Sequence, residues 1–264
     1  MTYGRRDMDR RHFLIKSSSF LLGSLFGLNG FSLAYGKGEK RGIFRPKIAL
    51  IIDDIGCSVC RARRFLEIEE PITYSILPRL SYSHDLALEI HHCGHEIMLH
   101  QPMEPYNSRL DPGPGALYVG DGADRIAGVV EENIAHVPFA TGVNNHMGSR
   151  FTSSEREIRE TLKVVEKSGL FFVDSLTSNR SIAYKTARGF HMPAASRNIF
   201  LDNVHDEAHI LKQLFKLRRH ALRYGHAIGI GHPFSVTARA IRRFSSALKN
   251  SDVSFVHVSS VLNT

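Results

Sequence analysis

The sequence contains no tryptophan, only three cysteines among 264 residues, and no apolar run long enough to span a membrane. The absence of tryptophan excludes no class of protein. Cys57, Cys60 and Cys93 do not suffice for a structural zinc site of the paired-cysteine type, because a second pair is missing. Glycine, proline and charge are present in ordinary amounts, and no internal period is visible, which excludes collagen-like, repeat and disordered chains. The apolar content of 42% is sufficient for a sizeable globular core.

The first 34 residues differ from the rest of the chain. A pair of arginines, Arg10 and Arg11, precedes a moderately hydrophobic stretch at residues 20–33 that glycine and serine dilute, as in a twin-arginine export signal. Small residues then stand where a signal peptidase reads the chain. We therefore expect export to a bacterial periplasm, with a signal peptide at 1–34, a linker at 35–46 and a folded domain at 47–264. An uncleaved membrane anchor is the alternative.

Removal of this segment changes the charge only moderately. It carries five basic and two acidic residues, so the formal net charge falls from +8 to +5. The remaining basic residues are scattered, except for a cluster on one expected helix: Lys216, Arg218, Arg219 and Arg223. We interpret the cluster as a solvent-exposed helix face and expect no nucleic-acid binding, which would require a stripe or a recognised fold. In an oxidising compartment Cys57 and Cys60 either form a tight disulfide or remain two free thiols.

From Lys47 onward, short β-branched runs alternate with amphipathic helical stretches, a pattern typical of a parallel sheet with crossover helices. The expected strands are 47–53, 72–77, 95–99, 141–145, 170–174, 198–202, 227–231 and 254–258. The expected helices are 58–69, 82–93, 122–136, 154–168, 205–224 and 235–249. Residues 101–122 are rich in Pro, Gly and Asp and predict a long loop. Seven or eight β/α units in one chain favour a single α/β domain, a distorted (β/α)7-type barrel, over an open sheet.

Acids and histidines stand where these strands are expected to end. Asp53 and Asp54 directly follow the apolar run 47–52, and because side chains alternate along a strand the two carboxylates should point in different directions. The other strand ends carry His100 with Glu104 four residues later, His146, Asp174 and His232. Each has an ordinary structural explanation alone, such as a helix cap or a hydrogen-bonded surface histidine. Together they predict a pocket, since parallel strands end at one edge of a barrel.

The segments around these residues resemble the polysaccharide deacetylase (NodB-like) superfamily, and most closely its divergent branch, the divergent polysaccharide deacetylase family. The resemblance spans about residues 47–260 and is carried by 51–56, 94–105, 145–149, 174–175 and 229–233. It implies a distorted barrel of about seven β/α units. The combination of motifs is specific, whereas the double aspartate alone would not be.

The resemblance also implies a metal site. In the superfamily the first acid of the pair is the catalytic base and the second binds the metal, which implies these roles for Asp53 and Asp54. The first metal histidine corresponds to His100, but the second falls on Glu104. Either Glu104 replaces that histidine or His146 completes the site from the next strand. We favour Asp54, His100 and His146 as ligands of a divalent cation, most plausibly Zn²⁺. Glu104 would then contact the ligands without binding the metal itself.

The resemblance assigns His232 as the acid that protonates the leaving group, and we expect Asp174 to orient it. The predicted reaction is hydrolysis of an acetylated envelope carbohydrate, with Asp53 accepting a proton from the attacking water. We expect removal of N-acetyl groups in preference to O-acetyl groups. A non-catalytic carbohydrate-binding or regulatory module on the same scaffold is the alternative. A glycoside hydrolase is disfavoured, because Asp53 and Asp54 are adjacent in sequence rather than on opposite walls.

Overall fold

The computed structural model describes residues 45–249, 251 and 253–262. The expected signal peptide at 1–34 and nearly all of the expected linker lie outside these residues. Within the described part of the chain, no helix is both long and apolar enough to cross a membrane.

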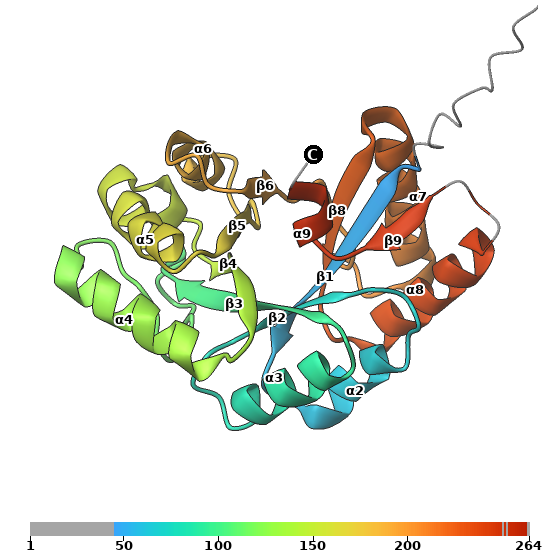
Figure 1. The fold of residues 1–264 in the computed structure, drawn as a ribbon, viewed down its shortest axis with the longest axis horizontal. Helices are drawn as coiled ribbons and strands as arrows, with labels where there is room; N and C mark the ends of the chain where they lie inside the picture. The colour runs from blue at the N-terminus through green and yellow to red at the C-terminus, as the bar shows by residue number, and fades with distance from the viewer. Residues whose placement is uncertain (1–44, 250, 252, 263–264) are drawn as a thin grey trace, which may run out of the picture. The chain divides into compact units, whose positions relative to one another are not determined.

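One parallel sheet with covering helices makes up the described domain (Figure 1). The strands are β1 Lys47–Ile55, β2 Thr73–Ile76, β3 Glu96–Met103, β4 Ala140–Met147, β5 Phe171–Asp174, β6 Ala194–Ser196, β7 Ile199–Phe200, β8 His226–Gly231 and β9 Ser254–Val256. The helices are α2 Val59–Leu66, α3 Ser83–His92, α4 Ala123–His136, η1 Phe151–Ser153 (a 3₁₀ turn), α5 Glu155–Lys167, α6 Ala183–Gly189, α7 Glu207–Tyr224, α8 Ser235–Leu248 and α9 Ser259–Leu262.

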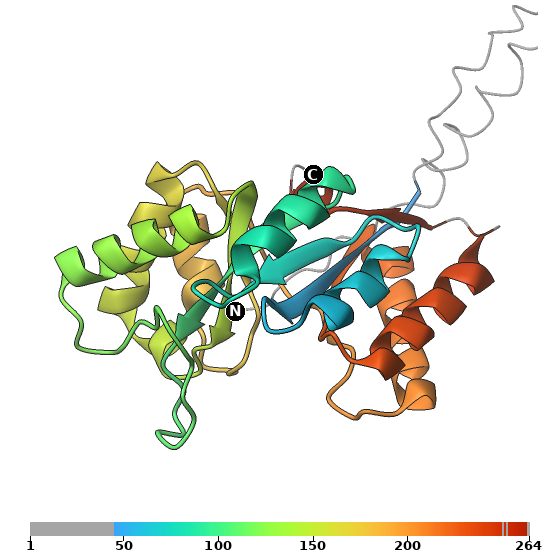
Figure 2. The ribbon, with the colours of Figure 1, turned by 90° about the horizontal axis from the view of Figure 1, so that it is seen from below.

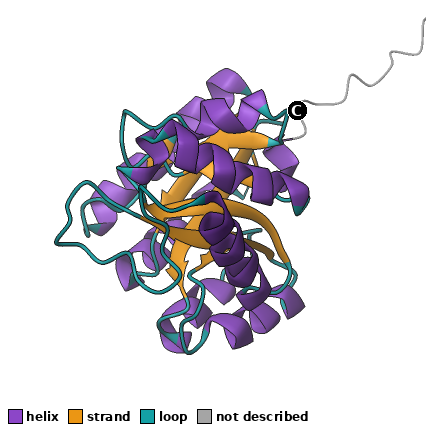
Figure 3. Cartoon of the chain, turned by 90° about the vertical axis from the view of Figure 1, so that its left-hand side faces the viewer, coloured by secondary structure: helices purple, strands orange, loops and turns teal. Residues whose placement is uncertain are grey.

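The strand order shows how the sheet curls. The sequence of neighbours is β6-β5-β4-β3-β2-β1-β8-β7, with β9 added beside β1, and every pairing is parallel. Only Arg197 and Asn198 separate β6 from β7, yet β6 pairs with β5 and β7 pairs with β8. The sheet therefore begins and ends on one short segment and curls into a half-barrel with helices outside it (Figures 2 and 3). The expected single-domain distorted α/β barrel is confirmed.

Alternation along the strands divides the core into two layers. On β1, the side chains of Ile48, Leu50 and Ile52 pack with the helices, and those of Ala49 and Ile51 pack inside the curl with Ile228 and Ile230 of β8. The next side chain of β1 that points inside the curl, after those of Ala49 and Ile51, is that of Asp53, which is 3% exposed. The inside of the curl is thus apolar along most of its length and becomes polar at the carboxyl ends of the strands.

The expected helices and strands agree with the structure to within a few residues, with two informative differences. Strand β3 continues to Met103 because it pairs with β4 as far as Met147, so the expected loop at 101–122 begins later. Within that loop, Leu117 folds back to hydrogen-bond with the backbone of Pro102 and Glu104. Helices α6 and α9 and strand β6 were not expected, since these short segments lack a clear apolar period. The three cysteines are unpaired and exposed, so the disulfide alternative is not realised.

Candidate metal centre

A bulge at the end of β1 brings both aspartates to the same place. The pairing register with β2 shifts between Ile52 and Ile55, and Asp54 has a φ of 58°, a conformation that a non-glycine residue adopts at a penalty of about 1–3 kcal/mol. Regular alternation would turn the Asp54 side chain away from that of Asp53. Instead, Oδ2 of Asp53 lies 3.6 Å and Oδ1 of Asp54 lies 3.2 Å from Nε2 of His100. The alternation expected from the sequence therefore breaks at Asp54.

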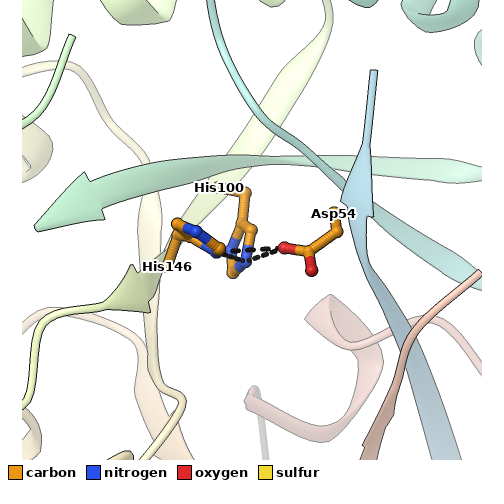
Figure 4. Close-up of side chains that lie close together, drawn as sticks. All are labelled: Asp54, His100 and His146. Atoms are coloured by element: carbon orange, nitrogen blue, oxygen red, sulfur yellow. Dashed lines mark hydrogen bonds and ion pairs between the residues drawn. The ribbon is translucent and has the colours of Figure 1, made fainter. Parts of the chain in front are cut away.

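Three side chains from three strands point their ligand atoms at one another (Figure 4). Oδ1 of Asp54 lies 3.2 Å from Nε2 of His100 and 3.0 Å from Nδ1 of His146, and the two nitrogens are 3.1 Å apart. Ligand atoms about 2.0–2.1 Å from a zinc ion are about 3.3 Å apart at tetrahedral angles and about 2.9 Å apart at right angles. The observed triangle falls between these values, so the residues present fit a divalent cation.

The charges of the site favour a cation as well. Oδ1 of Asp54 is buried and accepts no hydrogen bond from a well-placed donor among the described residues, although both histidine nitrogens are near. Burial alone would raise the pKa of Asp54, but His100 and His146 hold it far below its ordinary value. Burial alone would lower the pKa of His100, but Asp53 and Asp54 raise it. A proton or a metal ion can satisfy this centre, and the two compete.

Asn144 connects the metal-site histidine to the buried aspartate. Its side-chain nitrogen donates to Oδ1 of Asp53 over 2.9 Å, and its oxygen accepts from Ser75 and lies 2.8 Å from Nδ1 of His100. An ionised carboxylate only accepts, so the amide must face Asp53 with its NH₂ group. Nδ1 of His100 therefore donates to Asn144, and in the neutral ring the lone pair of Nε2 is directed at Asp54 and His146. Asn144 was not among the residues expected at the site; its position two residues before His146, which places both on the same strand face, was the available signal.

His232 faces the metal centre from the end of β8. Its Nε2 lies 3.9 Å from Oδ2 of Asp54, while its Nδ1 lies 2.9 Å from Oδ1 of Asp202. The other oxygen of Asp202 accepts from the His232 backbone and from the Thr237 hydroxyl. Burial alone would lower the pKa of His232, but Asp202 and then Asp53 raise it to about 9.

The expectation that Asp174 orients His232 is wrong. The Asp174 carboxylate accepts hydrogen bonds from the backbone of Leu176, the hydroxyl of Ser181 and the backbone of Tyr184, which fixes the turn after β5. Strand β5 lies beside β4 and β6, whereas β7, which precedes Asp202, lies beside β8. The carboxylate that reaches His232 therefore comes from the neighbouring strand, and Asp202 stands at the end of the strand expected at 198–202.

Glu104 lies outside the three-residue centre. One of its oxygens pairs with Arg150 at 2.7 Å, and the other accepts the backbone N–H of Val119 at 2.8 Å. The carboxylate thereby ties the loop after β3 to the segment after β4. Its two oxygens are used by these contacts, and the cluster of possible ligands in the described residues is Asp54, His100 and His146.

A small pocket opens onto the centre. It has a volume of about 170 Å³ and is lined by Asp54, His146 and His232 together with Leu77 and Phe234. Drug-sized ligands occupy pockets of about 300–1,000 Å³, so this one has room for a small group only. Asp53 is 3% exposed and is not among the residues that line the pocket.

Three relatives are similar to most of this chain. The uncharacterized protein YibQ of Escherichia coli strain K12 is 32% identical over 221 residues, which cover 84% of this chain and 69% of that protein. An uncharacterized protein of Haemophilus influenzae is 31% identical over 72% of this chain and 67% of its own length. The crystal structure of the uncharacterized protein ATU2773 from Agrobacterium tumefaciens C58 is 26% identical, with a TM-score of 0.79 over 82% of this chain and 89% of that one.

A more distant structure shares the fold. The family 4 carbohydrate esterase from Streptomyces lividans, solved in complex with acetate, is 12% identical, with a TM-score of 0.53 over 81% of this chain and 93% of that one. The family model described as divergent polysaccharide deacetylase matches residues 50–262. The chain therefore belongs to the divergent polysaccharide deacetylase family.

Proposed function

We propose that the protein is a metal-dependent hydrolase that removes acetyl groups from an envelope carbohydrate, N-acetyl groups in preference to O-acetyl groups. The twin-arginine-type segment at 1–34 would export it to the compartment of that substrate. The observation that carries the proposal is the triangle of Asp54, His100 and His146 ligand atoms, with Asp53 and His232 beside it. Two imidazole nitrogens and one carboxylate oxygen are a typical donor set for zinc, so Zn²⁺ is the cation we favour.

The residues of the chain divide the work by position. A divalent cation on the three ligands would activate water and polarise the acetyl carbonyl. Asp53 would accept the proton from the attacking water: burial raises the pKa of this carboxylate, and Asn144 holds it in place. His232 would donate a proton to the leaving amine, because Asp202 holds its Nδ1 and a pKa of about 9 keeps it protonated at neutral pH.

The pocket supports an acetyl group as the part of the substrate that enters. Its volume of about 170 Å³ is small, and the apolar side chains of Leu77 and Phe234 lie on its wall near the charged residues. An acetyl methyl against such a wall would leave the carbonyl beside the ligand triangle. The carbohydrate itself would then bind outside, across the rim of the pocket.

The first test is the metal content of the full chain, purified without a metal-affinity tag. About one equivalent of metal is expected in the parent and none in Asp54→Ala or His146→Ala, whereas Glu104→Ala should keep its metal. Acetate release from N-acetylated and O-acetylated oligosaccharides is then measured on the loaded protein. Metal without acetate release would favour the non-catalytic binding or regulatory module, and absence of metal after zinc and cobalt have been offered would refute the proposed hydrolase.

A further inference from the structure

Helix α7 carries four cations on one face. Lys212, Lys216, Arg219 and Arg223 are spaced by four, three and four residues, which places them in one row along the helix. We call these four residues the basic face. It shares Lys216, Arg219 and Arg223 with the cluster expected to be a solvent-exposed helix face, and with Lys212 it extends over three turns.

The positive charge of the basic face is not compensated. Residues 208–226 contain no Asp or Glu, and within the described part of the chain none of the four cations forms an ion pair. The neighbouring helix α8 is different: Arg239 pairs with Glu207 and Arg242 pairs with Glu67. An unpaired row of like charges raises the free energy of the isolated domain through repulsion, and a polyanionic partner would relieve it.

Exposed apolar side chains accompany the basic face. Leu222 and Tyr224 are 44% and 58% exposed and, with Lys216, Arg219 and Arg223, line a shallow groove of about 620 Å³. The guanidinium of Arg223 lies over the ring of Tyr224 at 5.3 Å. Cations interleaved with exposed leucine and tyrosine suit the headgroup region of a bilayer, where phosphates meet the first methylene groups.

The position of the basic face in the fold gives a second argument. The backbone N–H of Lys47, at the start of β1, donates to the carbonyl of Gly225, the residue that ends α7. The chain thus enters the described domain beside the end of α7. Strand β8 starts at His226, so this end of α7 lies at the amino edge of the sheet, opposite the edge with the metal centre.

We propose that the basic face binds an anionic phospholipid surface. Docking through the basic face would leave the pocket with Asp54 and His232, which lies at the opposite edge of the sheet from the Arg223 end of α7, open to an envelope polymer. The inference does not depend on the proposed hydrolysis, because α7 carries none of the residues of the metal centre.

The test measures cosedimentation of the full chain with phosphatidylcholine vesicles and with vesicles of phosphatidylcholine and phosphatidylglycerol. The readout is the ratio of the two affinities, since an apolar contribution from residues 20–33 enters both. Each Lys or Arg near an anionic surface contributes about fivefold to binding, so Lys216→Gln, Arg219→Gln and Arg223→Gln combined should reduce the ratio on the order of 100-fold. Raised salt should reduce it in the parent as well.

A matched triple variant removes three exposed cations that lie on other elements than α7: Arg109→Gln in the loop after β3, Lys167→Gln on α5 and Lys185→Gln on α6. It has the same net charge as the first triple variant and should keep the parent's ratio. Equal losses in both triple variants would show a general charge effect and overturn the proposal. It would also be overturned if the parent did not prefer the anionic vesicles, or bound soluble polyphosphate but neither type of vesicle. Unchanged thermal unfolding midpoints show that both variants are folded.

Discussion

Replacement of Asn144 by leucine tests whether this side chain sets up the metal site. The substitution keeps the number and branching of the side-chain heavy atoms but removes the donor to Asp53 and the acceptor that faces His100 and Ser75. Each buried polar group left without a partner destabilises the fold by about 1–3 kcal/mol, so a loss of several kcal/mol in the free energy of unfolding is expected. Loss of the residue that orients a metal-binding histidine weakens metal affinity about 10–100-fold.

Asn145→Leu is the matched control. Asn145 is the next residue on the same strand, equally buried, and its side chain makes two hydrogen bonds, from the backbone N–H of Ser175 and to the carbonyl of Met147. It contacts none of the three ligand residues through these bonds. We therefore expect Asn145→Leu to destabilise the fold to a similar extent while the zinc affinity of the folded protein stays close to that of the parent.

Two measurements separate the effects. Zinc affinity is determined by competition with a chelator on folded protein, and stability by denaturant unfolding of the metal-free form. The reasoning is refuted if Asn144→Leu binds zinc within about threefold of the parent, because a merely structural amide would behave in this way. It is equally refuted if both variants lose the same metal affinity, since the orienting contact would then be irrelevant.

Three further predictions concern single side chains. Asp202→Asn should bring the pKa of His232 down from about 9 toward its ordinary value of 6.5. The alkaline limb of the pH profile of acetate release should therefore move to lower pH by at least about one unit. An unmoved limb would exclude His232 as the acid. Asp53→Asn should keep stoichiometric metal, as shown by elemental analysis, and lose on the order of 10²–10⁴-fold in turnover; full activity would remove Asp53 as the base. Glu157 of α5 accepts from the hydroxyl of Ser154 and the backbone of Gly120, which outweigh burial and lower its pKa from 4.5 to about 2. The folded-state pKa lies below the unfolded one, so the stabilisation is complete above pH 4.5 and is lost as the pH falls through about 2. Glu157→Gln should therefore reduce the free energy of unfolding by about 1–2 kcal/mol at pH 7, and denaturant unfolding at decreasing pH should show the difference from the parent shrinking.

The local pattern of the sequence was sufficient for most of the fold. Strands such as β1 and β8 are apolar runs that end in a polar residue, and helices such as α5 have a clear apolar stripe, so both kinds of element could be placed from residues a few positions apart. Because parallel strands end at one edge of a sheet, the proximity of His100, His146 and Asp54 could be predicted before any contact between them was known. The resemblance to the family then indicated which of these residues bind the metal and which act as base and acid.

Other parts of the site required the tertiary structure. Asp174 and Asp202 both follow an apolar run, and the sequence gives no reason to choose between them as the partner of His232. The choice depends on which strand lies beside β8, and β7 reaches that place only because the chain crosses from one edge of the sheet to the other at Arg197 and Asn198.

The same distinction explains the two aspartates. Alternation along a regular strand separates neighbouring side chains, and nothing in the local sequence shows that the pairing register between β1 and β2 shifts beside Asp54. The sequence by itself determined the elements and the edge where the acids and histidines gather, because periodicity and strand ends are local properties. The tertiary structure alone decided that Asn144 holds His100 and Asp202 holds His232, because these contacts depend on strand order and register across long separations in the chain.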